Sequence, residues 1–297
     1  NLLRHNFHVT IHDLNKEAAT ELLAAGAQWA DSAKAVAEAS DCAITCLPSI
    51  KAVSTVMTQD DGILAGLKAG CTWIEMSTND LKEIKRLAAI AETKGIACLE
   101  APVTGGVHKA EGGEITVLVG GHEAVYKKHL PVLQAMGGKV FHMGPLGSAS
   151  TIKVITNMLA FIHLVSAGEA MMLAKQAGLD LTQAFEAIRA SSGNSFVHET
   201  ETKVILSGSY NIGFTMDLAC KDLLLAHQLG QEYNVPLELA GHVQQIFMRA
   251  RAQYGGSAWS PKVVKLLEDA LGSELRAPGF PEVLSPDDAL TQVVRRT

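Results

Sequence analysis

The sequence predicts a parallel α/β domain, doubly wound, followed by an all-helical domain. In the first half of the chain, short apolar runs alternate with helical stretches, which is typical of βαβ units. After Gly147 the strand signals stop, and the stretch from Ser148 to about Ala177 holds one glycine and no proline. The chain has 297 residues, of which 47% are hydrophobic and 19% charged, so it is long enough to fill two cores.

The elements of the first half follow from local periodicity. His8–His12 alternates apolar and polar residues with period two, and later apolar runs end at proline or paired glycines. Strands are expected at 8–12, 41–47, 72–76, 96–99, 115–119 and 139–142, and helices at 16–25 and 81–94. Strands separated by helices in this way predict a parallel sheet.

The second half reads as helices throughout. Residues 148 to about 177 predict one long, mostly buried helix, and further helices are expected at 181–190, 218–233 and 237–254. The stretch after Leu271 holds three prolines and predicts a loosely ordered tail. We therefore expect a cofactor-binding domain at 1–146, a helical substrate and oligomerisation domain at 147–272, and a tail at 273–297.

Composition argues against several kinds of function. The formal net charge is −6, which does not favour general binding to nucleic acid. The five cysteines form no C-x-x-C pair, so neither a disulfide framework nor a metal site is expected, and a reducing cytoplasm is the default compartment. We also expect no apolar run that approaches the roughly 18 residues of a membrane span, and no signal peptide.

The first residues suggest an incomplete cofactor fold. Asn1–His5 resembles the end of a helix and leads directly into a strand. In dinucleotide-binding folds, an acidic residue follows the glycine-rich turn by about 20 residues. Asp13 has the position of that acid, whereas no G-x-G-x-x-G stands between a strand and a helix. The expectation is that the first βα unit is absent from this sequence.

Asp13 is the first candidate cofactor residue. Its carboxylate can accept hydrogen bonds from the adenosine ribose of NAD and would repel the additional phosphate of NADP. The same residue can equally be the N-cap of a helix that begins near Asn15 or Lys16. Spacing alone does not separate these two interpretations.

Other candidates follow the carboxyl ends of predicted strands, where open α/β sheets bind ligands. Leu47-Pro48-Ser49 and Ser77-Thr78-Asn79 follow two such strands, and each can instead cap a helix. Pro102–Gly106 follows a third, and Thr104, Gly105 and Gly106 can present a hydroxyl and backbone N–H groups to an anion. A plain Gly-Gly turn is the simpler reading of the last segment.

Lys153 is the sharpest candidate for chemistry. It lies within the most apolar predicted helix, and Asn157 follows four residues later on the same face. Burial would lower the pKa of such a lysine toward the range of a general acid or base. The alternative is a lysine that extends to the surface beside an asparagine. Lys221-Asp222 is a similar pair that can also be a simple surface ion pair, and Glu169 and His163 are more typical of structural residues.

Together, these motifs resemble the β-hydroxyacid dehydrogenase family, the group of 3-hydroxyisobutyrate dehydrogenase and tartronate semialdehyde reductase. The resemblance covers roughly residues 1–270. The family signature D-A-P-V-S-G-G corresponds to Glu100–Gly106 (EAPVTGG), and G-x-x-G-x-G-x-x-x-K-x-x-N-N corresponds to Gly144–Asn157 (GPLGSASTIKVITN). The K-D-L motif corresponds to residues 221–223. The family combines an N-terminal Rossmann domain with an all-α domain joined by a long helix.

The resemblance implies roles for individual residues. Lys153 would be the general acid/base and Asn157 its substrate-orienting neighbour, while Thr104, Gly105 and Gly106 would hold the substrate carboxylate. The residues implied to contact the cofactor are Leu47, Pro48, Thr78 and Lys221, with Asp13 favouring NAD over NADP. The chain departs from these signatures at four positions: Glu100 for Asp, Thr104 for Ser, Ala149 for Gly, and Thr156 for the first Asn.

The implied function is an NAD-dependent oxidoreductase of the EC 1.1.1 class that interconverts a small 3-hydroxy acid and its semialdehyde, as 3-hydroxyisobutyrate dehydrogenase does. Tartronate semialdehyde, succinic semialdehyde and threonate- or serine-type acids fit the same motifs. An imine reductase and a non-catalytic nucleotide-binding module are the alternatives from other classes. The apolar long helix further predicts a homodimer or homotetramer.

Overall fold

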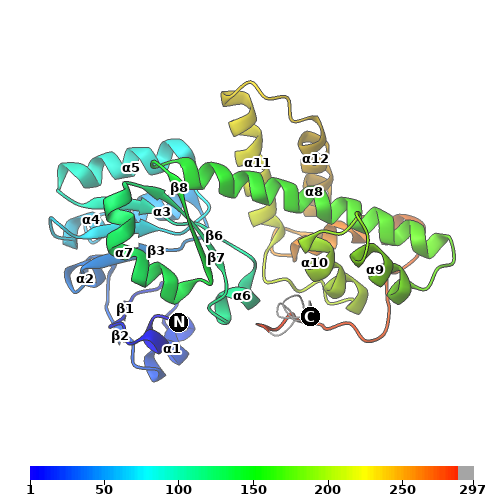
Figure 1. Ribbon diagram of the computed structural model, residues 1–297, viewed down its shortest axis with the longest axis horizontal. Coiled ribbons are helices and arrows are strands. Elements are labelled where there is room, and N and C mark those ends of the chain that lie inside the picture. Colours follow the sequence, from blue (N-terminus) through cyan, green and yellow to red (C-terminus); the bar gives the residue numbers. More distant parts are fainter. Residues whose placement is uncertain (287–297) are drawn as a thin grey trace, which may run out of the picture. The chain divides into compact units, whose positions relative to one another are not determined.

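The computed structural model describes residues 1–286 and divides the chain into two compact units (Figure 1). The first unit comprises Asn1–Gly105 and Lys109–Lys153, and the second comprises Gly106–His108 and the chain from Val154 onward. The division at Lys153 lies inside the long helix, a few residues beyond the boundary at 146 that the sequence suggested.

A six-stranded sheet forms the centre of the first unit. Its strands are β3 (Cys42–Thr45), β4 (Thr72–Glu75), β5 (Ala97–Glu100), β6 (Val103–Thr104), β7 (Thr116–Gly121) and β8 (Lys139–Gly144). The order is β3-β4-β5-β7-β6, and β8 also pairs with β7. Strands β3, β4 and β5 are parallel, but β7 is antiparallel to both β5 and β6. The expectation of an entirely parallel sheet was therefore wrong at β7.

The first residues form a separate two-stranded sheet. Strand β1 (Thr10–Ile11) pairs in parallel with β2 (Gln28–Trp29). The short helices around it are η1 (Leu3–His5), η2 (Lys16–Ala19) and α1 (Thr20–Ala24). Within the described residues, no glycine-rich turn joins a strand to a helix in this region.

Both faces of the large sheet are covered, because successive side chains along a strand point to opposite sides. Ala43 and Trp73 pack on one side, whereas Ile44, Ile74 and Leu99 pack on the other. The first side is covered by α2 (Ala33–Glu38), α3 (Ile50–Thr58), α4 (Ile63–Gly66) and α5 (Leu81–Thr93), and the second by α7 (Glu123–Met136). The short helix α6 (Val107–Glu111) follows β6.

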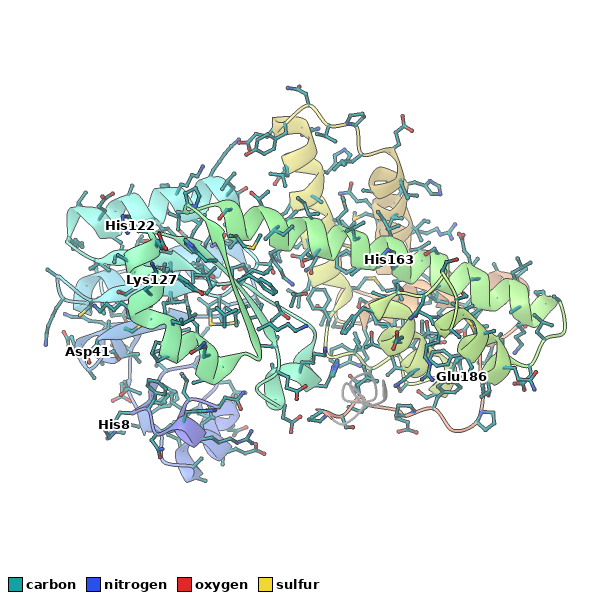
Figure 2. The ribbon with its side chains drawn as sticks, viewed as in Figure 1. His8, Asp41, His122, Lys127, His163 and Glu186 are labelled. Atoms are coloured by element: carbon teal, nitrogen blue, oxygen red, sulfur yellow. The ribbon has the colours of Figure 1, made fainter. Side chains whose placement is uncertain are left out.

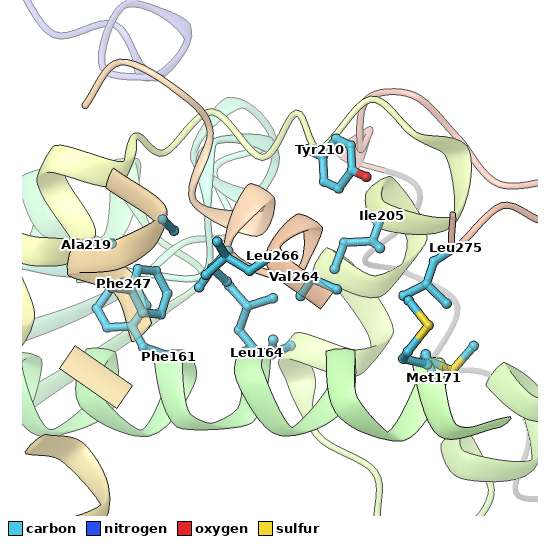
Figure 3. Close-up of a cluster of buried hydrophobic side chains, with 14 of the residues drawn as sticks. Phe161, Leu164, Met171, Ile205, Tyr210, Ala219, Phe247, Val264, Leu266 and Leu275 are labelled. Carbon is cyan, nitrogen blue, oxygen red and sulfur yellow. The ribbon is translucent and has the colours of Figure 1, made fainter. Parts of the chain in front are cut away.

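The second unit is helical, as predicted. Its elements are most of α8 (Ser148–Gln176), followed by α9 (Leu181–Arg189), α10 (Phe196–Ser207), α11 (Met216–Glu232), α12 (Glu238–Tyr254), η3 (Ser260–Val263) and α13 (Lys265–Leu271). Figure 3 shows its core, in which Phe161, Leu164 and Met171 of α8 contact a cluster that includes Phe247 and Val264. Spacings of three and seven residues put the three α8 side chains on one face.

Helix α8 is long and apolar enough to cross a membrane by length and composition alone. The expectation that no apolar run has this length was therefore wrong. A core helix of a soluble protein meets the same criterion, and α8 carries Phe161, Leu164 and Met171 into the helical core. We therefore interpret α8 as a core helix.

The segment that follows α13 is packed against the helical unit, in contrast to the expected loose tail. Leu275 is fully buried, and its N–H donates to Glu268 Oε1 at 2.8 Å. The Arg276 guanidinium donates to the same oxygen at 2.9 Å. The prediction for 287–297 lies outside the described residues.

Candidate active site

Lys153 lies in the second turn of α8 and is only 7% exposed. Asn157 follows one helical turn later and is 9% exposed. A lysine that extends to the surface would expose its ammonium group, so the surface alternative does not describe Lys153. The structure therefore has a buried lysine with a buried amide one turn away.

The turn before α8 depends on glycine at two positions. Gly144 and Gly147 have φ angles of +122° and +104°, a region that residues with a Cβ rarely adopt. Ala149 replaces a glycine of the family pattern, yet it lies within the helix and does not have a positive φ. The replacement of glycine by Ala149 therefore causes no backbone strain.

Asn157 is held by an acidic side chain from α11. Its Nδ2 donates to Asp222 Oδ2 at 2.6 Å, and the Lys221 ammonium donates to Asp222 Oδ1 at 2.7 Å. Asp222 is 1% exposed, so the Lys221–Asp222 pair is not a simple surface pair. Because both carboxylate oxygens are engaged, the Asn157 amide has a fixed orientation. Sequence reasoning gave Asp222 no role, since its partner is 65 residues away.

The proposed carboxylate-binding segment ends strand β6 and has an unusual backbone. Gly105 and Gly106 have φ angles of +128° and +89°, so both positions require glycine. A Cβ on Gly105 would lie 3.1 Å from Lys109 Cδ, which places the aliphatic chain of that lysine beside the segment. Thr104 is partly exposed at the end of β6. Sequence reasoning did not select Lys109.

The loops that follow β3 and β4 are joined by hydrogen bonds. The N–H of Leu47 donates to Ser77 Oγ at 2.8 Å, and the N–H of Ser77 donates to Glu75 Oε1 at 2.7 Å. Glu75 also bonds to the Thr45 hydroxyl, which accepts from Trp73 Nε1. Burial raises the pKa of Glu75, and the bonds from Ser77 and Thr45 oppose that shift. A buried carboxylate thus fixes the spacing of the two loops.

The loop after β3 caps the next helix with one of the expected residues, whereas the loop after β4 does not. Ser49 caps α3, because its Oγ accepts from the N–H of Ala52 at 3.1 Å. Helix α5 is capped by Asp80 instead of Asn79. Asn79 is buried, and its Nδ2 has no hydrogen-bond partner among the described residues. Pro48 is exposed and Thr78 is partly exposed at this edge.

Asp13 is an exposed residue that follows β1. Asn15, and not Asp13, provides the N-cap of η2. The Oδ1 of Asp13 accepts from the N–H of Asn15 at 2.8 Å, and no partner of Oδ2 is found in residues 1–286. An accessible carboxylate oxygen here and the unsatisfied Asn79 donor fit a dinucleotide laid along the carboxyl ends of the strands. Asp13 and Asn79 therefore fit a bound dinucleotide cofactor.

Lys153 lies within electrostatic reach of the loop after β3. Desolvation and the charge of Glu75 raise the pKa of the Cys46 thiol, and the charge of Lys153 lowers it. Since Cys46 directly precedes Leu47, the ammonium is close to the loop that is expected to contact the cofactor. Within the first unit, Lys153 and Glu75 at the end of β4 thus both influence the Cys46 thiol, which precedes Leu47.

Other polar residues of the long helix do not belong to this group. His163 is exposed on α8, where Figure 2 shows it, and Glu169 is also exposed. In the part of the chain that the structure describes, no three His, Cys, Asp or Glu side chains could hold a metal ion.

Comparison with known proteins identifies the family. A family model described as the NAD binding domain of 6-phosphogluconate dehydrogenase matches residues 1–144. A second, described as NAD-binding of NADP-dependent 3-hydroxyisobutyrate dehydrogenase, matches residues 147–267. The 2-(hydroxymethyl)glutarate dehydrogenase of Eubacterium barkeri is 37% identical over 92% of this chain and 91% of its own.

Two further relatives agree with this result. The NAD-dependent L-serine dehydrogenase of Pseudomonas aeruginosa is 34% identical over 78% of this chain and 80% of its own length. The crystal structure of 3-hydroxyisobutyrate dehydrogenase from Salmonella typhimurium has a TM-score of 0.82 and 31% identity, covering 89% of this chain and 93% of that one. The chain belongs to the 3-hydroxyisobutyrate dehydrogenase, or β-hydroxyacid dehydrogenase, family of NAD(P)-dependent 3-hydroxyacid dehydrogenases.

Proposed function

We propose that this protein oxidises a small 3-hydroxy acid to its semialdehyde with NAD, and that Lys153 is the general acid/base. The observation that carries the proposal is the burial of Lys153 in α8, within reach of the loop after β3. A lysine in that position can take the hydroxyl proton when it is neutral. In the reverse direction its ammonium gives the proton to the carbonyl oxygen.

The cofactor supplies hydride transfer when it is bound. We assign its binding to Asp13, Leu47, Pro48 and Thr78 in the domain of residues 1–146, and to Lys221 in the helical domain of residues 147–272. The free Oδ2 of Asp13 supports a preference for NAD, because a carboxylate accepts from a ribose diol and repels the phosphate of NADP.

Three residues are proposed to hold the substrate carboxylate: Thr104, Gly105 and Gly106. Positive φ angles at both glycines let backbone N–H groups turn toward an anion without interference from a Cβ. Asn157, oriented by Asp222, would bond to a substrate oxygen. Fixing the carboxylate sets the position of C3, and positioning of this kind is a large part of the rate enhancement.

The substrate class follows from the chemistry that relatives share. 2-(Hydroxymethyl)glutarate, L-serine and 3-hydroxyisobutyrate all contain a primary hydroxyl group β to a carboxylate and differ at C2. We therefore propose a 2-substituted 3-hydroxypropanoate as substrate. Tartronate semialdehyde, succinic semialdehyde and threonate are the alternatives that the motifs allow.

Two other classes of function receive less support. An imine reductase of similar architecture usually has another residue in place of Lys153. A non-catalytic nucleotide-binding module would not require a buried lysine, because burial of an ammonium group costs solvation energy. Both alternatives predict no turnover of hydroxy acids.

We also propose that this protein lies in the cytoplasm, where its five free cysteines would stay reduced. We also propose a homodimer or homotetramer, because α8 carries exposed Leu159 and Leu173 beside its buried face. Sedimentation velocity that shows only monomer would contradict the second assignment.

The experiment that tests the proposal measures NADH absorbance with NAD and a panel of 3- and 4-hydroxy acids. Lys153→Ala is expected to lower turnover by about 10²–10⁴-fold and to leave NAD affinity nearly unchanged. The matched control is Lys127→Ala, which removes an exposed lysine of α7 (Figure 2). If Lys153→Ala retains more than about a tenth of the rate, Lys153 is not the acid/base. NADP is run in parallel and is expected to be the poorer cofactor.

A further inference from the structure

Glu100 makes an unusual set of contacts at the end of β5. Its side chain is 1% exposed, and its Oε1 accepts from the N–H groups of Gly147 at 2.6 Å and Ala149 at 2.8 Å. Its Oε2 accepts from the Ser150 hydroxyl. A carboxylate from the sheet therefore binds the first turn of α8, where free N–H groups and the helix dipole favour a negative charge.

This arrangement is costly, which argues that it serves a purpose. Burial raises the pKa of Glu100, and the bonds from Ser150, Ala149 and Gly147 only partly oppose that shift. Glu75 is the register partner of Glu100 on the neighbouring parallel strand and is equally buried. Keeping two carboxyl groups in a protein interior costs free energy, because burial disfavours the charged form of each.

The sheet leaves room for the Glu100 side chain. Gly120 of β7 is its antiparallel partner, and a Cβ at Gly120 would lie 2.2 Å from Glu100 Oε1 and 2.9 Å from its Cγ. Any side chain at position 120 would therefore meet the glutamate. The glutamate reaches α8 by crossing the space that this glycine leaves open.

Two parts of the proposed site meet at this residue. Glu100 directly precedes residues 101–105, which end in Thr104 and Gly105 of the proposed carboxylate-binding segment. Ser150, which donates a hydrogen bond to Glu100, lies three residues before Lys153. We infer that Glu100 is a positioning residue that holds the carboxylate-binding segment and the lysine of α8 in one fixed geometry. This inference rests on the proposed function, since it assumes the roles of Lys153 and of the segment.

The first test is Glu100→Gln, which keeps the shape of the side chain. Its amide NH₂ would face the Gly147 and Ala149 N–H groups or the Ser150 hydroxyl, which are themselves donors. We expect kcat to fall about 10–100-fold, because small displacements of catalytic groups are costly. KM for NAD should stay within about twofold, since the loops after β3 and β4 are untouched. Exchange of the Gly147 and Ala149 amides should become about tenfold faster, as after loss of a helix cap. Unchanged kcat and unchanged exchange would overturn the inference.

Gly120→Ala provides an independent test that leaves Glu100 itself in place. If the new methyl group acts by displacing the carboxylate, Gly120→Ala alone should reproduce the Glu100→Gln defect. The double variant should then be little worse than either single variant. Additive losses would show that the two positions act separately and would contradict the inference. Ser150→Ala, which removes one bond, serves if Glu100→Gln does not fold.

The control is Glu75→Gln, which neutralises the neighbouring buried carboxyl group on β4. It should leave exchange at Gly147 and Ala149 unchanged, because Glu75 bonds to Thr45 and Ser77 and not to α8. Faster exchange in this variant would mean that any neutralised carboxyl group loosens α8. Failure of the proposed function has a separate signature: Lys153→Ala would retain turnover, while amide exchange would still report on Glu100.

Discussion

At the scale of single residues, the contacts that matter most join positions far apart in sequence. Lys153 and Asn157 could be selected from the sequence because helical spacing puts both on one face of an apolar helix. Glu100 and Asp222 could not be given roles, because their partners lie 50 and 65 residues away. Local periodicity contains no information about such pairs, and only the tertiary structure reveals them.

Asp222 offers a prediction at this scale. Asp222→Asn cannot accept from both Asn157 and Lys221, so the Asn157 amide should lose its fixed orientation. We expect turnover to fall about tenfold, because small displacements of a substrate-orienting group are costly. Steady-state kinetics with the best hydroxy acid measures the effect. Asp269→Asn, an exposed change on α13, is the control and should leave turnover unchanged.

Glu201 gives a prediction about pH. Its Oε2 is buried without a partner among the described residues, and burial raises its pKa from the ordinary 4.5 to about 8. The folded state therefore holds a proton that the unfolded chain has lost, so stability falls as pH rises through this window, by at most about 1.4 kcal/mol per unit. Glu201→Gln should remove this dependence.

The measurement is denaturant unfolding at pH 5 and pH 8.5. Glu201→Gln should gain stability relative to wild type on going to the higher pH. Glu186→Gln changes an exposed carboxylate of α9 and should show no such gain (Figure 2). Equal pH dependence of Glu201→Gln and wild type would show that Glu201 does not hold that proton.

At the scale of elements, prediction succeeded where one local signal dominates. The strand expected at 72–76 is Thr72–Glu75, the helix at 81–94 is Leu81–Thr93, and the long helix is Ser148–Gln176. Helix α10 was missed because its sequence carries six polar residues in a row (198–203), and the buried His198 and Thr202 disrupt the apolar pattern. The antiparallel direction of β7 could not be predicted either, because a strand's own residues do not specify the direction of its neighbour.

Helix α8 offers a prediction at both of its ends. Gly147 precedes the helix with φ +104°, and a Cβ there would lie 2.4 Å from Leu81 Cδ1. Gly178 follows the helix with φ +78° and has open space around it. Gly178→Ala should cost about 1 kcal/mol of stability and leave activity unchanged. Gly147→Ala should cost more and also lower kcat, because it moves the turn that Glu100 binds.

Thermal unfolding and turnover of both glycine variants provide the measurement. If both variants lose the same stability and both keep full activity, the turn before α8 tolerates displacement. That result would also weaken the case for Glu100 as a positioning residue.

At the scale of the whole molecule, each unit has a core of its own. The sheet of the first unit has apolar clusters on both faces, and the helical unit surrounds Phe161, Leu164 and Phe247. The sequence anticipated this division through the change of pattern near Gly147. It did not anticipate that Leu275, which follows α13, completes the second core, because a proline-rich stretch without periodicity resembles a loose tail.

Leu275→Ala tests this contribution. The side chain is fully buried, so its truncation should destabilise the helical unit by about 2–5 kcal/mol. Leu271→Ala removes a leucine that is 53% exposed and is expected to cost much less. Urea unfolding followed by circular dichroism separates the two. Equal costs would show that the segment after α13 is not part of the core.

The Glu100 side chain occupies the place of a Cβ at Gly120, and this limits how sequences of this family can diverge. A side chain added at position 120 while glutamate stays at position 100 brings atoms into collision, so the two positions depend on each other. A relative that keeps this glutamate in this conformation must therefore keep the glycine. Relatives can therefore be sorted by this pair of positions before any of them is assayed.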